Sequence, residues 1–138
     1  MSEQRTVHVE RLSKARFRAT NARGGTIDMG EATGTDFTPV ELLLAALAGC
    51  TGIDVDYITA KRAEATSLTI TVDATKVRDA GGNRLSDIVL SFDASFPGGE
   101  GGDAARGVLP DAIAKSHDRL CTVGRTIELG APITTTIL

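Results

Sequence analysis

The segment Thr38-Pro39-Val40-Glu41-Leu42-Leu43-Leu44-Ala45-Ala46-Leu47-Ala48-Gly49-Cys50-Thr51 carries the strongest structural signal in this sequence. Thr38 is a preferred N-cap residue, Pro39 suits the first helical position, and Glu41 completes a capping box with Thr38. From Leu42 to Cys50 the sequence is apolar on every side, which is typical of a helix that is buried all round. We therefore predict a long helix that begins at this cap and ends near Arg62.

Short alternating segments precede and follow this helix. Two long alternating runs, 67–77 and 85–96, are joined by the turn residues Ala80-Gly81-Gly82-Asn83, which predicts a β-hairpin. Before the helix, β-branched or alternating residues with turn residues between them predict three short antiparallel strands, at 6–12, 16–22 and 26–29.

The last third of the chain predicts a helix and a strand. Asp103 can cap a second helix that continues to about Leu120, with a break or kink at Pro110. The β-branched segment 133–138 predicts a closing strand. The predicted order is three strands, a helix, two strands, a helix and a strand. This order indicates an α+β fold with antiparallel sheets rather than a parallel, doubly wound one.

Length and composition predict a single globular domain that covers residues 1–138. Hydrophobic residues make up 41% of the sequence and charged residues 24%, as in ordinary soluble proteins. The formal net charge is -3, and no basic run is present, which argues against nucleic acid or an anionic membrane as the main partner. The apolar stretch 42–50 is short for a membrane span, and the polar N-terminus lacks a secretory signal. We therefore expect a cytoplasmic protein.

The two cysteines, Cys50 and Cys121, are the residues that could carry chemistry. A structural disulfide is unusual in the cytoplasm, so the pair suggests redox or metal chemistry, although two inert buried thiols are the simpler alternative. Gly49 and Gly52 flank Cys50 at a cost of up to about 1 kcal/mol each, which indicates open space or a close backbone approach near the sulfur. The chain lacks closely spaced zinc ligands, and its glycine-rich loop 98–102 lacks a phosphate-binding motif, so we expect neither metal nor cofactor.

The segment 38–51 resembles the central-helix signature of the OsmC/Ohr family, and the whole chain fits that family's length and element order. Cys121, which follows a helical run and precedes Thr122-Val123, is similar to the family's second cysteine. This resemblance implies sheets packed around a long central helix in an intertwined homodimer, with two active sites at the subunit interface. It also implies thiol-dependent reduction of organic hydroperoxides.

The resemblance also implies a role for each site residue. Cys50 would be the peroxidatic cysteine, which must be a thiolate to attack a peroxide and which becomes a sulfenic acid. Cys121 would resolve the sulfenic acid to a disulfide, and an external dithiol would reduce that disulfide. In the family an arginine of the N-terminal strands supplies a cation and a glutamate orients it. Glu41 matches that glutamate by its Pro-x-Glu context.

The matching arginine is selected by counting back from Gly25-Thr26-Ile27-Asp28. This count selects Arg16, with Arg11 and Arg18 as close competitors. The chain lacks the glycine-rich turn around the arginine, and the proline after the second cysteine, that mark the hydroperoxide-resistance branch. It is more similar to the general OsmC-like branch. The second functional hypothesis is therefore a non-catalytic dimer that senses redox state or binds a small apolar ligand.

Helix geometry bears on the assembly of this site. Cys50 lies nine positions after Glu41, which places them about 180° apart and about 13.5 Å along a straight helix. If both serve one site, Glu41 comes from a second subunit across a two-fold axis, or the helix breaks near Gly49. The dimer is the favoured interpretation, because it would also bury the apolar helix.

Overall fold

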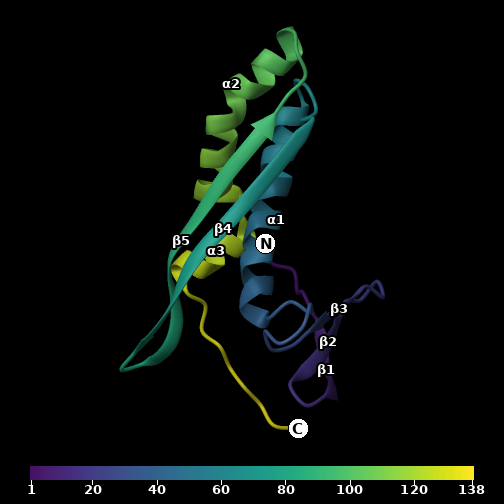
Figure 1. Ribbon diagram of the computed structural model, residues 1–138, viewed down its shortest axis with the longest axis vertical. Helices are drawn as coiled ribbons and strands as arrows, with labels where there is room; N and C mark the ends of the chain where they lie inside the picture. The colour runs from purple at the N-terminus through teal and green to yellow at the C-terminus, as the bar shows by residue number, and fades with distance from the viewer. The chain divides into compact units, whose positions relative to one another are not determined.

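The computed structural model describes all residues, 1–138, and divides into two compact units, Met1–Leu43 and Leu44–Leu138. Helix α1, Pro39–Ala60, begins in the first unit and continues through the second without a break at Gly49 (Figure 1). That the two units act as one domain stays a prediction.

The predicted capping box begins helix α1. The backbone N–H of Glu41 donates to Oγ1 of Thr38 at 3.1 Å, and Oε1 of Glu41 accepts the N–H of Thr38 at 2.8 Å. Two N–H groups that the helix leaves without an internal partner are thereby satisfied. The sequence prediction of this helix start is confirmed.

The first unit contains a three-stranded antiparallel sheet in the order β1-β2-β3, as the sequence predicts. Its strands are β1 His8–Ser13, β2 Arg16–Thr20 and β3 Thr26–Met29. A tight turn at Lys14 and Ala15 joins the first two strands, and Ala15 adopts a left-handed conformation with φ of 61°.

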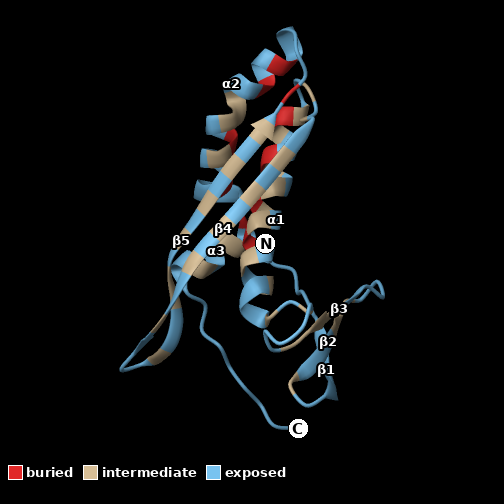
Figure 2. Ribbon diagram, viewed as in Figure 1, coloured by how far each residue is buried: buried red, intermediate tan, exposed pale blue.

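The second unit contains the predicted hairpin, formed by β4 Ser67–Asp79 and β5 Gly82–Ser95. The register shifts at a bulge between Asp73 and Thr75, and Asp87 on the partner strand has a φ of 53°. Along the regular part of β4, half-buried and exposed residues alternate, since successive side chains point to opposite faces (Figure 2).

The C-terminal region differs from the prediction in several ways. Helix α2, Glu100–Lys115, begins before Asp103, has Gly99 at its N-cap and is not broken at Pro110. A π-helical turn, η1 Ser116–Leu120, follows it directly, and a further helix that the sequence analysis missed, α3 Thr122–Leu129, comes next.

The predicted closing strand at 133–138 is wrong, because residues 131–138 have no regular secondary structure. Ile133 and Ile137 have high strand propensity and are almost fully exposed. A strand also needs a neighbour that pairs with its backbone N–H and C=O groups. The segment pairs with no strand of this chain, so its propensity alone does not make it a strand.

Helix α1 is buried along one stripe and not all round as predicted. The stripe consists of residues four apart, Leu47, Thr51, Val55 and Thr59 (Figure 2). Ile53 and Tyr57 are 60% and 74% exposed, so an apolar face of the helix remains uncovered in the single chain.

Gly52 allows the hairpin to approach helix α1 closely. A Cβ atom at Gly52 would lie 3.0 Å from Cδ1 of Ile70, whereas a Cβ at Gly49 would meet nothing within 4 Å. Of the two glycines beside Cys50, only Gly52 has a packing role within the chain.

Helix α1 is long and apolar enough to cross a membrane by length and composition. The central helix of a soluble domain meets the same criterion, so this property does not decide the environment of the helix.

Candidate active site

The fold brings Cys50 and Cys121 together, although 70 residues separate them in the sequence. Cys50 lies midway along α1 and is half-buried, and Cys121 lies between η1 and α3 and is 3% exposed. Both thiols are free. The hydroxyl of Thr51, the residue that follows Cys50, donates to Cys121 Sγ at 3.4 Å, which places the second cysteine beside the first.

The surroundings of Cys50 oppose its ionisation. Burial raises the pKa of the Cys50 thiol above its usual value, and the neighbouring Cys121 raises it further. The backbone N–H groups of Val123 and Thr122, in the first turn of α3, lower the pKa in part. No positively charged side chain of the second unit lowers the pKa of Cys50. A reactive thiolate at Cys50 therefore needs a positive charge from elsewhere.

Cys121 caps the N-terminus of helix α3 with its sulfur atom. It has an extended backbone between two helical segments, with φ of −73° and ψ of 101°. Its Sγ accepts the N–H of Gly124 at 3.2 Å and the hydroxyl of Thr51 at 3.4 Å. A Cβ at Gly124 would lie 3.3 Å from both this sulfur and Cδ1 of Leu47, so glycine permits the close approach.

A second polar contact ties the π-helical turn to helix α1. The hydroxyl of the fully buried Ser116 donates to Oδ2 of Asp54 at 2.9 Å, and the N–H of Cys121 donates to the carbonyl of Ser116 at 2.9 Å. Asp54 follows Cys50 by one helical turn. Together with the Thr51 contact, this bond holds Cys121 against the middle of α1.

Sequence reasoning missed Thr51, Asp54 and Ser116. The available signal was two polar residues in a helix that was expected to be apolar: Thr51 beside Cys50, and Asp54 one turn after it. Their partner segment could not be identified from the sequence, because it lies more than 60 residues away.

A cavity of about 600 Å³ lies in the second unit, with Cys121 and Thr51 in its wall. The rest of the lining is mostly apolar and comes from α1, β5, α2 and α3; it includes Leu47, Leu85, Ile88, Leu90, Phe92, Ile113 and Ile127. The cavity can hold the apolar part of a small organic molecule.

His117 also lines this cavity and is exposed. Its Nδ1 lies 2.9 Å from Oδ1 of Asp118, and its Nε2 lies 2.9 Å from Oε1 of Glu128. The hydrogen bond with Asp118, followed by the charge of Glu128, raises the pKa of His117. The Glu128 contact links η1 to α3 across Cys121.

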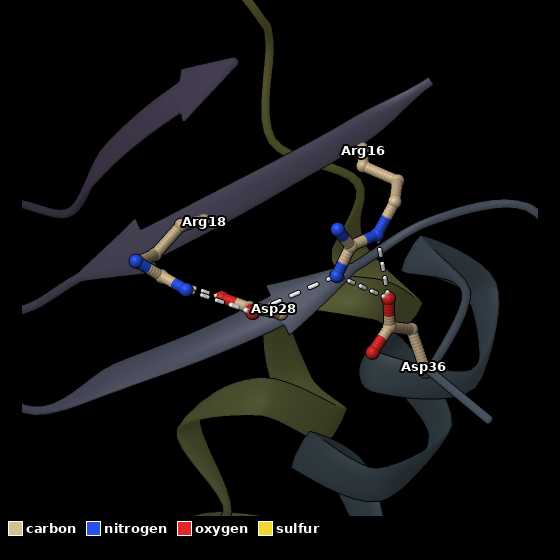
Figure 3. A network of polar contacts seen from close by, with 4 residues as sticks. All are labelled: Arg16, Arg18, Asp28 and Asp36. Atoms are coloured by element: carbon tan, nitrogen blue, oxygen red, sulfur yellow. Dashed lines mark hydrogen bonds and ion pairs between the residues drawn. The ribbon is translucent and has the colours of Figure 1, made fainter. Parts of the chain in front are cut away.

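In the first unit, two arginines of β2 form an ion-pair network with two aspartates (Figure 3). Arg18 makes two hydrogen bonds to Asp28, at 2.6 and 3.0 Å. Arg16 contacts Oδ2 of Asp36 through Nε at 3.0 Å and a terminal nitrogen at 2.9 Å, and lies 3.8 Å from Asp28. Asp28 is therefore shared, but most of its interaction goes to Arg18.

The third candidate, Arg11, lies on the opposite face of the same sheet. It pairs with Phe17, whereas Arg16 and Arg18 flank Phe17 in β2 and point to the other side. The structure thus separates Arg11 from the other two arginines.

Glu41 serves as the capping residue of α1, and the carboxylate that holds Arg16 is that of Asp36. Arg16 and Glu41 belong to the first unit, and both cysteines belong to the second. The participation of Arg16 and Glu41 in a site with the cysteines stays a prediction.

An antiparallel α+β fold with a free cysteine in the long helix and a second one beside it is the arrangement of the OsmC/Ohr-type proteins. The chain belongs to this family: the model described as OsmC-like protein matches residues 32–136. No curated protein matches the sequence.

Solved structures of similar fold come from several bacteria. A hypothetical protein from Aquifex aeolicus VF5 has 23% identity and a TM-score of 0.75, with 94% of this chain and 90% of that one covered. An OsmC-like protein of unknown function from Vibrio cholerae has 16% identity and a TM-score of 0.73, with 92% and 95% covered. An organic hydroperoxide resistance protein from Legionella pneumophila has 15% identity and a TM-score of 0.60, with 91% of each chain covered. These likenesses confirm the fold, and the family suggests a redox function.

Proposed function

We propose that this protein reduces organic hydroperoxides by thiol chemistry, with Cys50 as the peroxidatic and Cys121 as the resolving cysteine. The observation that carries the proposal is the meeting of two free cysteines at the N-terminus of α3, where the N–H of Gly124 donates to Cys121 Sγ and the N–H groups of Val123 and Thr122 lower the pKa of Cys50. Such N–H groups stabilise thiolates. The description of the Legionella relative as a hydroperoxide resistance protein agrees with this chemistry.

In the proposed reaction the Cys50 thiolate attacks the distal oxygen of the hydroperoxide. An S–O bond forms, the O–O bond breaks, and the alkoxide takes a proton and leaves as the alcohol, so that Cys50 becomes a sulfenic acid. The Cys121 thiol then attacks Cys50, an S–S bond forms and water leaves. A dithiol returns two electrons and restores both thiols.

The raised pKa of Cys50 makes a cation necessary for this reaction. We assign it to Arg16, which pairs with Asp36 in the single chain, with Glu41 as the residue that orients the arginine in the assembled protein. Arg18, which Asp28 holds at 2.6 and 3.0 Å, is the alternative.

The proposed assembly is a homodimer in the cytoplasm. One apolar face of α1 is uncovered in the single chain: Ile53 is 60% exposed and Tyr57 is 74% exposed. A second copy of the chain would cover this face. Sedimentation at micromolar concentration tests the dimer; a monomer that retains activity would refute it.

A single-turnover assay tests the activity. Reduced protein mixed with one equivalent of cumene hydroperoxide should consume it and lose two free thiols per chain. Cys50→Ser should abolish the reaction, and Cys121→Ser should allow one turnover but leave a sulfenic acid that a dimedone probe labels. Unchanged peroxide and two intact thiols in the wild-type protein would refute the proposal.

The cavity supports a second candidate function, in which the protein binds a small apolar ligand or senses redox state without catalysis. Its lining is mostly apolar, and only the buried Cys121 sulfur lies in its wall. Tight binding of a fluorescent fatty acid, without any loss of thiols to cumene hydroperoxide, would favour this candidate.

A further inference from the structure

We propose that the two sulfur atoms of the Cys50–Cys121 disulfide are not equivalent towards the reductant: the incoming thiolate attacks Cys50, and Cys121 leaves as a thiolate held by the hydroxyl of Thr51. The inference rests on the proposed function for the existence of the disulfide, and assigns Thr51 as a positioning residue in its reduction.

The exposure of the two cysteines favours attack at Cys50. Cys121 is 3% exposed and is enclosed by α1, η1 and α3, whereas Cys50 is only half-buried. Thiol–disulfide exchange requires the attacking sulfur to approach one sulfur of the disulfide directly, so the rate depends on access. Within its own chain, Cys50 is therefore the sulfur that a dithiol can reach.

The hydrogen bonds favour departure of Cys121. The hydroxyl of Thr51, at 3.4 Å, and the N–H of Gly124, at 3.2 Å, both donate to Cys121 Sγ. A departing thiolate gains negative charge, and a donor that already points at the sulfur stabilises this charge without reorganisation. At Cys50 the backbone N–H groups of Val123 and Thr122 lower the pKa, but no side-chain hydroxyl donates to the sulfur. The better leaving group is therefore Cys121.

The Thr51 hydroxyl has no other hydrogen-bond partner in the structure. The side chain is buried, at 5% exposure, in the same stripe of α1 as Leu47 and Val55. Valine has nearly the same shape and would keep the packing, and serine would keep the hydroxyl. Thr51→Val and Thr51→Ser are thus a matched pair that separates the hydrogen bond from the packing.

The exchange balances in two steps. The first thiolate of the dithiol forms a bond to Cys50, the S–S bond breaks, and the electron pair goes to Cys121. The second thiol of the reductant, after losing its proton, attacks the mixed disulfide at the reductant's own sulfur and releases Cys50 as a thiolate. The dithiol is oxidised by two electrons, and the protein disulfide is reduced by two.

A trapping experiment with a monothiol tests the direction of attack. The protein is oxidised with diamide, so that the disulfide forms independently of any peroxidase activity, and is then mixed with substoichiometric glutathione. Acid quenching, N-ethylmaleimide labelling and tryptic mass spectrometry show which cysteine carries glutathione. Cleavage after Arg119 and Arg125 places Cys121 in a short peptide of its own.

We expect glutathione on Cys50 and maleimide on Cys121, in at least about tenfold excess over the reverse pattern. Thr51→Val should slow reduction about tenfold, as expected for loss of a hydrogen bond to a charged group, and should shift glutathione towards Cys121. Thr51→Ser should restore both the rate and the pattern.

Several results would overturn the inference. In the wild-type protein, glutathione could prefer Cys121 or label both cysteines equally. The Thr51→Val variant could keep the wild-type rate of reduction and labelling pattern. Diamide could also fail to form the disulfide. If the diamide-treated protein shows the expected pattern but the reduced protein ignores cumene hydroperoxide, the peroxidase proposal fails and the exchange direction stands.

Discussion

Two glycines of helix α2, Gly102 and Gly107, should respond in opposite ways to substitution by alanine. In an open helix position this change stabilises a protein by about 0.5–1 kcal/mol, because alanine is the better helix former and restricts the unfolded chain. Gly107 is such a position, since a Cβ there would meet nothing within 4 Å. Gly107→Ala should therefore raise the free energy of unfolding.

At Gly102 the same change meets the backbone of Pro97. An added Cβ would lie 1.7 Å from the Pro97 carbonyl oxygen and 2.8 Å from its carbon, well below the 3.0 Å that real contacts respect. These are main-chain atoms, so no side-chain rotation relieves the clash, and the entry to α2 must move. Overpacking of this kind costs about 1–3 kcal/mol, and we expect the upper end for Gly102→Ala.

Urea unfolding followed by circular dichroism at one protein concentration measures both effects. Gly102→Ala should lower the midpoint, and Gly107→Ala should raise it slightly, with similar slopes. If the two variants are equally stable, the close packing of the Pro97 turn against α2 is refuted.

Two further predictions concern charge. Arg16→Met should shift the pH profile of the peroxide reaction to higher pH, because burial raises the pKa of the peroxidatic cysteine and the proposed cation is lost. Arg11→Met, on the other face of the sheet, should leave the profile unchanged. Equal profiles for both variants would exclude Arg16 as the cation. Because Asp118 and then Glu128 raise the pKa of His117, its contribution to stability should be complete below about pH 6.5 and decrease as the pH rises through the higher folded-state pKa. The ion pairs of His117 are exposed, so this contribution to stability should stay below about 1 kcal/mol. Glu128→Gln should reduce the difference between the urea midpoints at about pH 5.5 and about pH 8.5. An unchanged difference would mean that the contact between His117 and Glu128 is not formed in solution.

The elements whose signals are local could be predicted from the amino-acid sequence alone. The capping box at Thr38 and Glu41 fixed the start of α1, and the alternating runs with a glycine turn between them predicted the β4–β5 hairpin. These signals involve residues within a few positions of each other, so that local hydrogen bonding and side-chain periodicity are sufficient to predict them. The same motif around Cys50 indicated the family, which the comparisons confirmed.

The surroundings of the second cysteine and the conformation of the C-terminal segment depend on contacts between distant parts of the chain. Two side-chain hydrogen bonds, from Thr51 to Cys121 and from Ser116 to Asp54, join segments that are more than 60 residues apart. No local sequence pattern specifies such pairs. The segment 133–138 shows the converse: it has the residues of a strand but no neighbouring strand, and propensity cannot supply the missing backbone partners.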